Sequence, residues 1–201
     1  MEENQSAYYG QYYIPLQNLE QEILQWLRKL VDAYAEQAGE TPVEHIRSRI
    51  KTAEGMQEKL HKKGFETTAD SALANVSDIV GFRLVTHFVG EVYDIVERMK
   101  QDGTFRVVKE KDYIANPKPN GYRSLHLTIR LPVFFAEKEV HVPVEIQLRT
   151  IAMDFWASLE HTIRYKKNLP INAEIETELK ECAASSREWD SKMEHLLHIL
   201  T

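Results

Sequence analysis

Two stretches of the sequence alternate between apolar and polar residues, and this alternation is what most constrains the fold. They cover residues 122–131 and 140–149. Successive side chains of a β-strand point to opposite faces of a sheet, so each stretch predicts a strand with one face in a core. The apolar rows are Leu125, Leu127, Ile129 and Leu131 in the first stretch, and Val140, Val142, Val144, Ile146 and Leu148 in the second.

The polar rows of the same stretches carry side chains with complementary chemistry. They are Tyr122, Ser124, His126, Thr128 and Arg130 in the first, and His141, Pro143, Glu145, Gln147 and Arg149 in the second. Such a row is often only the hydrated face of a sheet. Here the loop before the first strand, stiffened by two prolines and turned by Asn120-Gly121, adds Lys111 and Lys118. We therefore interpret this face as a functional surface.

The remaining elements follow from spacing. Residues 43–51 permit a capped helix or a strand, and we favour the strand because it aligns Arg47, Arg49 and Lys51, with a helix beginning near Thr52. Further strands are predicted at 82–88 and 105–111, and helices at 16–34, 91–103, 152–165 and from 173 onward. The last helix is expected to bury Ile175, Leu179, Cys182, Trp189 and Met193.

The predicted fold class is α+β: a five-stranded mixed sheet flanked by helices, with long amphipathic helices near both ends. The 201 residues provide one such domain with helical arms. The net charge of −6 argues against a general nucleic-acid binder, so any phosphate-binding site must be local. One cysteine, no apolar run long enough for a membrane span and no signal-peptide pattern predict a cytoplasmic protein without a membrane contact.

Two carboxylates suggest a metal site. Asp78 precedes one predicted strand and Glu145 lies within another; if these strands are neighbours, the pair suits Mg²⁺, which takes one or two carboxylates together with phosphate oxygens. The alternatives are a turn cap for Asp78 and surface pairing of Glu145 with Arg149 or Arg130. Clustered cations and an aromatic residue on the same face favour nucleotide phosphoryl chemistry. The sequence has neither a Walker A loop nor a glycine-rich kinase loop, so side chains would have to hold the phosphates.

Three blocks give these features a more specific reading. "DIVGFR", "KDYIANPKPNGYRSLH" and "VEIQLRTIAMDFWASLEH" resemble the signature blocks of RelA/SpoT-type alarmone synthetases, and the whole chain resembles a stand-alone small alarmone synthetase. The resemblance covers most of residues 41–167. It implies a nucleotidyltransferase-like synthetase sheet and transfer of the β,γ-pyrophosphate of ATP to the 3′-hydroxyl of GTP or GDP, giving pppGpp or ppGpp and AMP.

The resemblance also implies roles for individual residues. Asp78 and Glu145 would bind Mg²⁺, and Glu145 would help to deprotonate the attacking hydroxyl. The implied ATP-binding residues are Arg49, Lys51, Lys59 and Arg83. The implied GTP- or GDP-binding residues are Tyr122, His126, Lys118, Lys111 and Gln147, with Tyr122 stacked on guanine.

The implied organisation is an N-terminal helical arm at 1–40, a synthetase domain at 41–168 and a C-terminal helix at 169–201. The terminal helices are the expected contacts of a homotetramer. No His-Asp dipeptide of the family's hydrolase domain occurs, so synthesis without hydrolysis is expected. The alternatives are a catalytically silent guanine-nucleotide regulator and an RNA-binding module. The family admits an allosteric alarmone site at a subunit interface, for which no residue is assigned, and the cluster Tyr8, Tyr9, Tyr12 and Tyr13 stays without a role.

Overall fold

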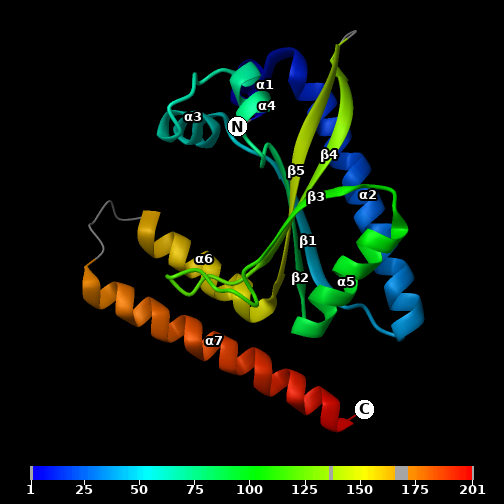
Figure 1. Ribbon diagram of the computed structural model, residues 1–201, viewed down its shortest axis with the longest axis vertical. Helices are drawn as coiled ribbons and strands as arrows, with labels where there is room; N and C mark the ends of the chain where they lie inside the picture. Colours follow the sequence, from blue (N-terminus) through cyan, green and yellow to red (C-terminus); the bar gives the residue numbers. More distant parts are fainter. Residues whose placement is uncertain (1, 136–137, 166–171, 201) are drawn as a thin grey trace.

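The computed structural model describes residues 2–135, 138–165 and 172–200, and its central element is a five-stranded mixed sheet (Figure 1). The strands are β1 (Val43–Ile50), β2 (Val80–Thr86), β3 (Val107–Asp112), β4 (Leu125–Phe135) and β5 (Lys138–Thr150). Their order across the sheet is β1-β2-β5-β4-β3. The β2–β5 pair is parallel and the other pairs are antiparallel. The predicted α+β class and five-stranded mixed sheet are confirmed.

Helices flank this sheet. They are α1 (Glu2–Tyr9), the 3-10 turn η1 (Gly10–Tyr12), α2 (Tyr13–Ala38), α3 (Ala53–Lys62), α4 (Ala69–Asn75), α5 (Val89–Asp102), α6 (Ile151–Tyr165) and α7 (Ala173–Leu200). Figure 1 shows α2 and α5 along one face of the sheet. The apolar rows of β4 and β5 lie in the core beneath them, with Leu127 and Ile146 completely buried. The opposite face stays open between α3 and α6, and it carries the polar rows.

The segment with two competing readings forms a strand. β1 covers Val43–Ile50, and α3 begins directly afterwards, where the Thr52 side chain accepts a hydrogen bond of 3.2 Å from the backbone of Gly55. Met56 and Leu60 of α3 are completely buried. The alternation therefore outweighed the capping pattern, because β1 pairs with β2 from Val43 to Ile50 and the backbone groups that face β2 are hydrogen-bonded.

Strand register brings the polar rows together on the open face. His126 lies opposite Gln147, and Thr128 lies opposite Glu145. Across the parallel pair, Glu145 lies opposite Gly81. The condition for the carboxylate pair is met, because the strand that follows Asp78 neighbours the strand that carries Glu145.

The C-terminal helix differs from the prediction in the face that it buries. Of the five residues predicted to be buried, only Leu179 is; Cys182 is exposed, and Trp189 and Met193 are each 56% exposed. The buried residues of α7 are Leu179, Ala183, Ser186 and Asp190. The prediction followed the apolar residues, whereas the buried face of α7 also holds polar contacts: Ser186 donates a hydrogen bond to the carbonyl of Ala152 on α6, and Asp190 pairs with Arg123.

The start of β4 differs from the prediction. β4 begins at Leu125, so Tyr122 and Ser124 belong to the loop before it, and Ser124 is completely buried instead of lying on the open face. The predicted division between residues 168 and 169 lies outside the described residues.

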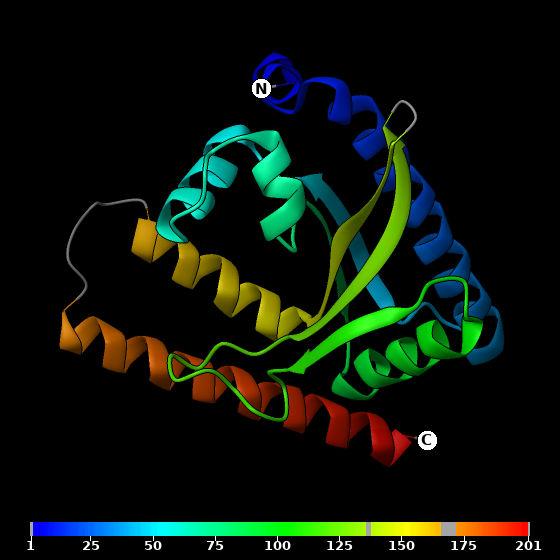
Figure 2. The same ribbon diagram turned by 45° about the horizontal axis from the view of Figure 1, so that its top comes forward.

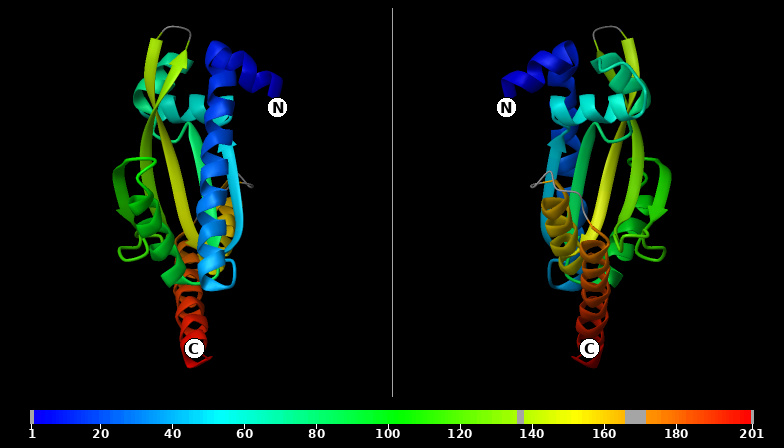
Figure 3. Two further views of the ribbon diagram at one scale, coloured as in Figure 1. Left: turned by 90° about the vertical axis from the view of Figure 1, so that its right-hand side faces the viewer. Right: turned by 90° about the vertical axis from the view of Figure 1, so that its left-hand side faces the viewer.

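Figure 3 shows α7 extending beyond the sheet, at the end opposite α1. Across the described ranges, none of the helices is both long and apolar enough to cross a bilayer.

Candidate active site

Two carboxylates face one cavity at the centre of the open sheet face. The cavity has a volume of about 230 Å³. Asp78 reaches it from the turn before β2, and Glu145 from β5. It is lined by Arg47, Ser48, Arg49, Asp78, Gly81, Phe82, Arg83, Glu145 and Gln147. The carboxylates of Asp78 and Glu145 are close enough that the negative charge of Asp78 opposes ionisation of Glu145.

Asp78 is held by two lysines. The Nζ atom of Lys59, on α3, lies 2.7 Å from Oδ1, and that of Lys51, directly after β1, lies 3.2 Å from Oδ2. Burial opposes ionisation of Asp78, but the hydrogen bond from Lys59 and the charge of Lys51 outweigh it, so the pKa of Asp78 lies below its usual value. Asp78 is thus an anion whose charge two ammonium groups balance.

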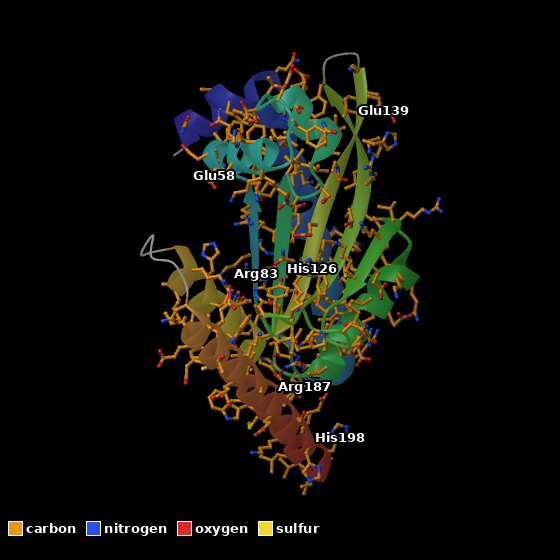
Figure 4. The ribbon with its side chains drawn as sticks, turned by 60° about the vertical axis from the view of Figure 1, so that its left-hand side comes forward. Glu58, Arg83, His126, Glu139, Arg187 and His198 are labelled. Carbon is orange, nitrogen blue, oxygen red and sulfur yellow. The ribbon has the colours of Figure 1, made fainter. Side chains whose placement is uncertain are left out.

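Two arginines complete the cationic side of the cavity. Arg49 projects from β1 and Arg83 from β2. Nη1 of Arg83 donates a hydrogen bond of 3.0 Å to Asp154, in the first turn of α6. Figure 4 labels Arg83 and His126, which lie at mid-height of the molecule between α3 and the start of α6. The four predicted ATP-binding residues therefore surround one side of the carboxylate pair.

On the other side, Glu145 is the end of a hydrogen-bonded chain. Its Oε2 accepts a hydrogen bond of 2.7 Å from Gln147, and its Oε1 lies 3.4 Å from Nδ1 of His126. Nε2 of His126 lies 2.8 Å from the hydroxyl of Tyr122. That hydroxyl also accepts a hydrogen bond of 2.6 Å from Arg149, so Arg149, Tyr122, His126 and Glu145 are joined in one chain.

This environment keeps Glu145 ionised. Burial alone would raise its pKa, but the hydrogen bonds from His126 and Gln147 outweigh burial and the charge of Asp78, and the pKa lies below its usual value. Glu145 pairs with neither Arg149 nor Arg130, the partners of the surface alternative. It is a half-buried acceptor pointing at the cavity.

The two predicted lysines of the neighbouring loop and strand lie near aromatic rings. Nζ of Lys118 is 4.5 Å from the ring centroid of Tyr122 and 4.7 Å from that of Tyr113. Nζ of Lys111 is 5.9 Å from the Tyr113 centroid. The five predicted acceptor-binding residues therefore form one continuous surface over β3, β4, β5 and the loop between β3 and β4.

The turn that presents Tyr122 needs its glycine. The backbone N–H of Gly121 donates to the carbonyl of Lys118 at 2.8 Å, and φ of Gly121 is +91°. A Cβ atom there would lie 2.4 Å from the Cβ of Ala183 on α7. Figure 2 shows the loop lying against α7. Glycine is therefore required by backbone conformation and by space.

Sequence reasoning missed two residues that organise the site. Arg149 is 4% exposed and donates to Tyr122, Gln147, Asp154 and Ser124. Asp154 accepts from both Arg149 and Arg83, at 3.1 and 3.0 Å. In the sequence analysis Arg149 stood in the predicted polar row and was named only as a possible surface partner of Glu145. The signal that was available is an acidic residue in the first turn of a helix, directly after a strand whose last residue but one is an arginine.

Known proteins share this arrangement of elements. The model for the region found in RelA / SpoT proteins matches residues 48–169. The GTP pyrophosphokinase YwaC of Bacillus subtilis is 47% identical over 155 residues, which are 77% of this chain and 74% of that protein. The GTP pyrophosphokinase YjbM of the same organism is 30% identical over 185 residues, 92% of this chain and 86% of that one.

Solved structures agree with the sequence relatives. Small alarmone synthetase 1 from Bacillus subtilis, bound to its product pppGpp, superposes with a TM-score of 0.85 at 29% identity, covering 94% of this chain and 96% of that one. Small alarmone synthetase 2 from the same organism gives a TM-score of 0.78 at 40% identity, covering 93% and 98% of the two chains.

Proposed function

The chain belongs to the RelA/SpoT family, and we propose that it is a stand-alone GTP pyrophosphokinase, a small alarmone synthetase. It transfers the β,γ-pyrophosphate of ATP to the 3′-hydroxyl of GTP or GDP, giving pppGpp or ppGpp and AMP. The observation that carries this function is the carboxylate pair Asp78 and Glu145, which faces one cavity between a cationic side and an aromatic side. The catalytically silent regulator and the RNA-binding module are not favoured, because the sequence and structural relatives named above are synthetases.

The cationic side is the proposed donor half-site, formed by Arg49, Lys51, Lys59 and Arg83. Ammonium groups act as compact charges for phosphate oxygens, whereas the planar guanidinium groups of Arg49 and Arg83 suit stacking on adenine. Lys51 and Lys59 already flank Asp78. This supports a site in which the triphosphate lies along the same carboxylate.

Asp78 and Glu145 are the proposed ligands of Mg²⁺. Within the described part of the chain, no group of three or more His, Cys, Asp or Glu residues gathers as a metal cage. Two ionised carboxylates at one cavity nevertheless fit Mg²⁺, which completes its coordination with substrate phosphates and water. When bound, the ion would neutralise charge that develops on the transferred phosphates.

The aromatic side is the proposed acceptor half-site. Tyr122 would stack on guanine, while His126, Lys118, Lys111 and Gln147 would contact the sugar and phosphates. The ionised Glu145 would accept the proton of the 3′-hydroxyl as that oxygen attacks the β-phosphorus of ATP. The bond from the β-phosphorus to the α,β-bridging oxygen breaks, and AMP leaves with the electron pair.

A homotetramer is proposed as the assembled form. Its support is an apolar groove of about 420 Å³ on the outside of α6 and α7, lined in part by Phe88, Phe155, Trp189 and Met193. Phe155 is 57% exposed, and Trp189 and Met193 are each 56% exposed. A second copy of α7 would cover these side chains. An allosteric alarmone or RNA ligand stays a prediction without assigned residues.

A cytoplasmic location and synthesis without hydrolysis are further parts of the proposal. ATP and GTP are cytoplasmic nucleotides, and the exposed thiol of Cys182 suits a reducing compartment. Similarity to stand-alone synthetases extends over 94% of the chain. This similarity supports a protein that synthesises the alarmone and does not hydrolyse it.

The function is tested by incubating the purified protein with Mg²⁺, ATP and either GTP or GDP and separating the products by ion exchange. The expected result is a guanosine penta- or tetraphosphate peak accompanied by an equal amount of AMP. Intact ATP and GTP under conditions in which both nucleotides bind would contradict a synthetase and favour the silent regulator.

A further inference from the structure

The N-terminal tyrosines, left without a role by the sequence, make a specific contact with the chain that carries the donor lysines. Tyr9 is 1% exposed, and its hydroxyl donates a hydrogen bond of 2.8 Å to the carbonyl of Lys51. One turn earlier on α1, the amide of Gln5 donates a hydrogen bond of 3.0 Å to the carbonyl of Ile50. Residues four apart share a helix face, so α1 binds two consecutive carbonyls at the end of β1.

These carbonyls belong to the residues that position the Lys51 side chain. The backbone N–H of Lys51 donates to the carbonyl of Ile79 at 2.8 Å, next to Asp78. Lys51 is therefore fixed on one side by the segment that enters β2 and on the other by Tyr9. The ammonium group of Lys51 lies 3.2 Å from Asp78. The backbone to which this side chain is attached is held in place by these hydrogen bonds.

The same arm contacts α3, which carries Lys59, and α4, which precedes Asp78. Asn4 donates a hydrogen bond to Glu54, in the first turn of α3, the helix that carries Lys59. The hydroxyl of Tyr12 donates to Asp70, in the first turn of α4, which leads to Asp78. Figures 1 and 3 show α1 beside α3 and α4, away from α6 and α7. The acceptor side is held differently, with Tyr122 fixed by Arg149.

We propose that the N-terminal arm, residues 2–12, is a positioning element of the donor half-site, with Tyr9 and Gln5 fixing the backbone that carries Lys51. The proposal rests on the proposed function for the identity of the donor as ATP. A partly buried carbonyl that loses its donor is left without that partner, so the end of β1 relaxes and the ammonium group of Lys51 moves relative to the phosphates. Burial raises the pKa of Tyr9, so the hydroxyl remains a protonated donor throughout the working pH range.

Tyr9→Phe tests the proposal, because it removes the hydroxyl and keeps the ring. The matched control is Tyr34→Phe, which also removes a phenolic hydrogen bond, the one of 3.0 Å from Tyr34 on α2 to Asp94 on α5. The expected result is a KM for ATP raised about fivefold in Tyr9→Phe, the equivalent of one typical intramolecular hydrogen bond, with the KM for the acceptor unchanged. Tyr34→Phe is expected to leave both KM values unchanged. Equal changes in both KM values of Tyr9→Phe, or no change, would overturn the proposal.

Binding of a non-hydrolysable ATP analogue, measured by calorimetry, tests the same arm without catalysis. Tyr9→Phe and Gln5→Leu are expected to bind it more weakly than the wild type and Tyr34→Phe, and unchanged binding by both would overturn the proposal. Gln5→Leu preserves the test if Tyr9→Phe fails to fold. An inactive wild type would refute the proposed function, whereas an active wild type with unaffected variants would refute only the role of the arm.

Discussion

Arg149 donates a hydrogen bond of 2.6 Å to the hydroxyl of Tyr122, and its guanidinium carbon lies 5.1 Å from the centroid of the Tyr122 ring. The ring proposed to stack on guanine is thus oriented by a buried charged side chain. The same arginine donates to Asp154, which also accepts from Arg83 on the donor side. One carboxylate therefore connects the arginines of both half-sites.

Arg149→Lys is expected to raise the KM for GTP or GDP and to lower the free energy of unfolding by about 1–3 kcal/mol, because an ammonium cannot reach the acceptors of the guanidinium fork. Steady-state kinetics and urea unfolding measure the two effects. Arg98→Lys is the matched control, since Arg98 also lies over a tyrosine ring, 4.2 Å from the centroid of Tyr34, and donates to the amide of Gln37. An acceptor KM unaffected by Arg149→Lys would contradict this role.

Tyr122→Ala is expected to weaken acceptor binding by about 1–3 kcal/mol through the loss of base stacking. Tyr122→Phe keeps the ring and should retain most of the affinity. Titration with GDP in the absence of ATP measures both. If Tyr122→Phe binds as weakly as Tyr122→Ala, the hydroxyl contacts to Arg149 and His126 are what matter, and stacking is refuted.

The buried pair of Arg123 and Asp190, 2.7 Å apart, joins the β3–β4 loop to α7. Burial raises the pKa of Asp190 despite the facing guanidinium, so the pair adds little net stability over apolar packing. Removing one partner, as in Arg123→Met, should cost about 3–5 kcal/mol of unfolding free energy, whereas Arg123→Met combined with Asp190→Leu should recover most of it. A double-mutant cycle in urea measures this, and a double variant as unstable as the sum of the single ones would contradict it.

Asp102 provides a pH-dependent contribution. Hydrogen bonds from Thr104 and from Trp26, the latter 2.8 Å long, lower its pKa. The stabilisation that these hydrogen bonds provide is fully present above the ordinary aspartate pKa of about 4. It is lost as the pH falls through the lower pKa that Asp102 has in the folded protein. The stability difference between the wild type and Asp102→Asn should therefore shrink in acid. Urea unfolding at neutral and acidic pH tests this, and a difference independent of pH would contradict it.

The exposed apolar face of α7 gives a prediction for assembly. Trp189→Glu combined with Met193→Glu should reduce the mass in sedimentation, because two charges cannot be buried between copies at low cost. Lys192→Glu, a change at an exposed neighbour on the same helix, should leave the mass unchanged. An unaltered mass in the double variant would show that this face is not the subunit contact.

The sheet was predictable because alternation identifies β4 and β5 directly, and the register then brings His126 opposite Gln147. The buried face of α7 was predicted wrongly, since it depends on how closely α6 and the Gly121 turn approach Ala183. The carboxylate pair was recognisable from its motifs. The shared contact of Asp154 was not, because it depends on where the start of α6 lies relative to β2, a non-local arrangement.

The most direct test of the central claim follows the β-phosphate. Protein is incubated with Mg²⁺, GDP and ATP labelled at the β-phosphorus, and the products are separated. The label is expected to move into the guanosine product and to be absent from AMP, and Glu145→Gln is expected to transfer none. Label in ADP or inorganic phosphate, with an unlabelled guanosine fraction, would contradict pyrophosphate transfer by this site.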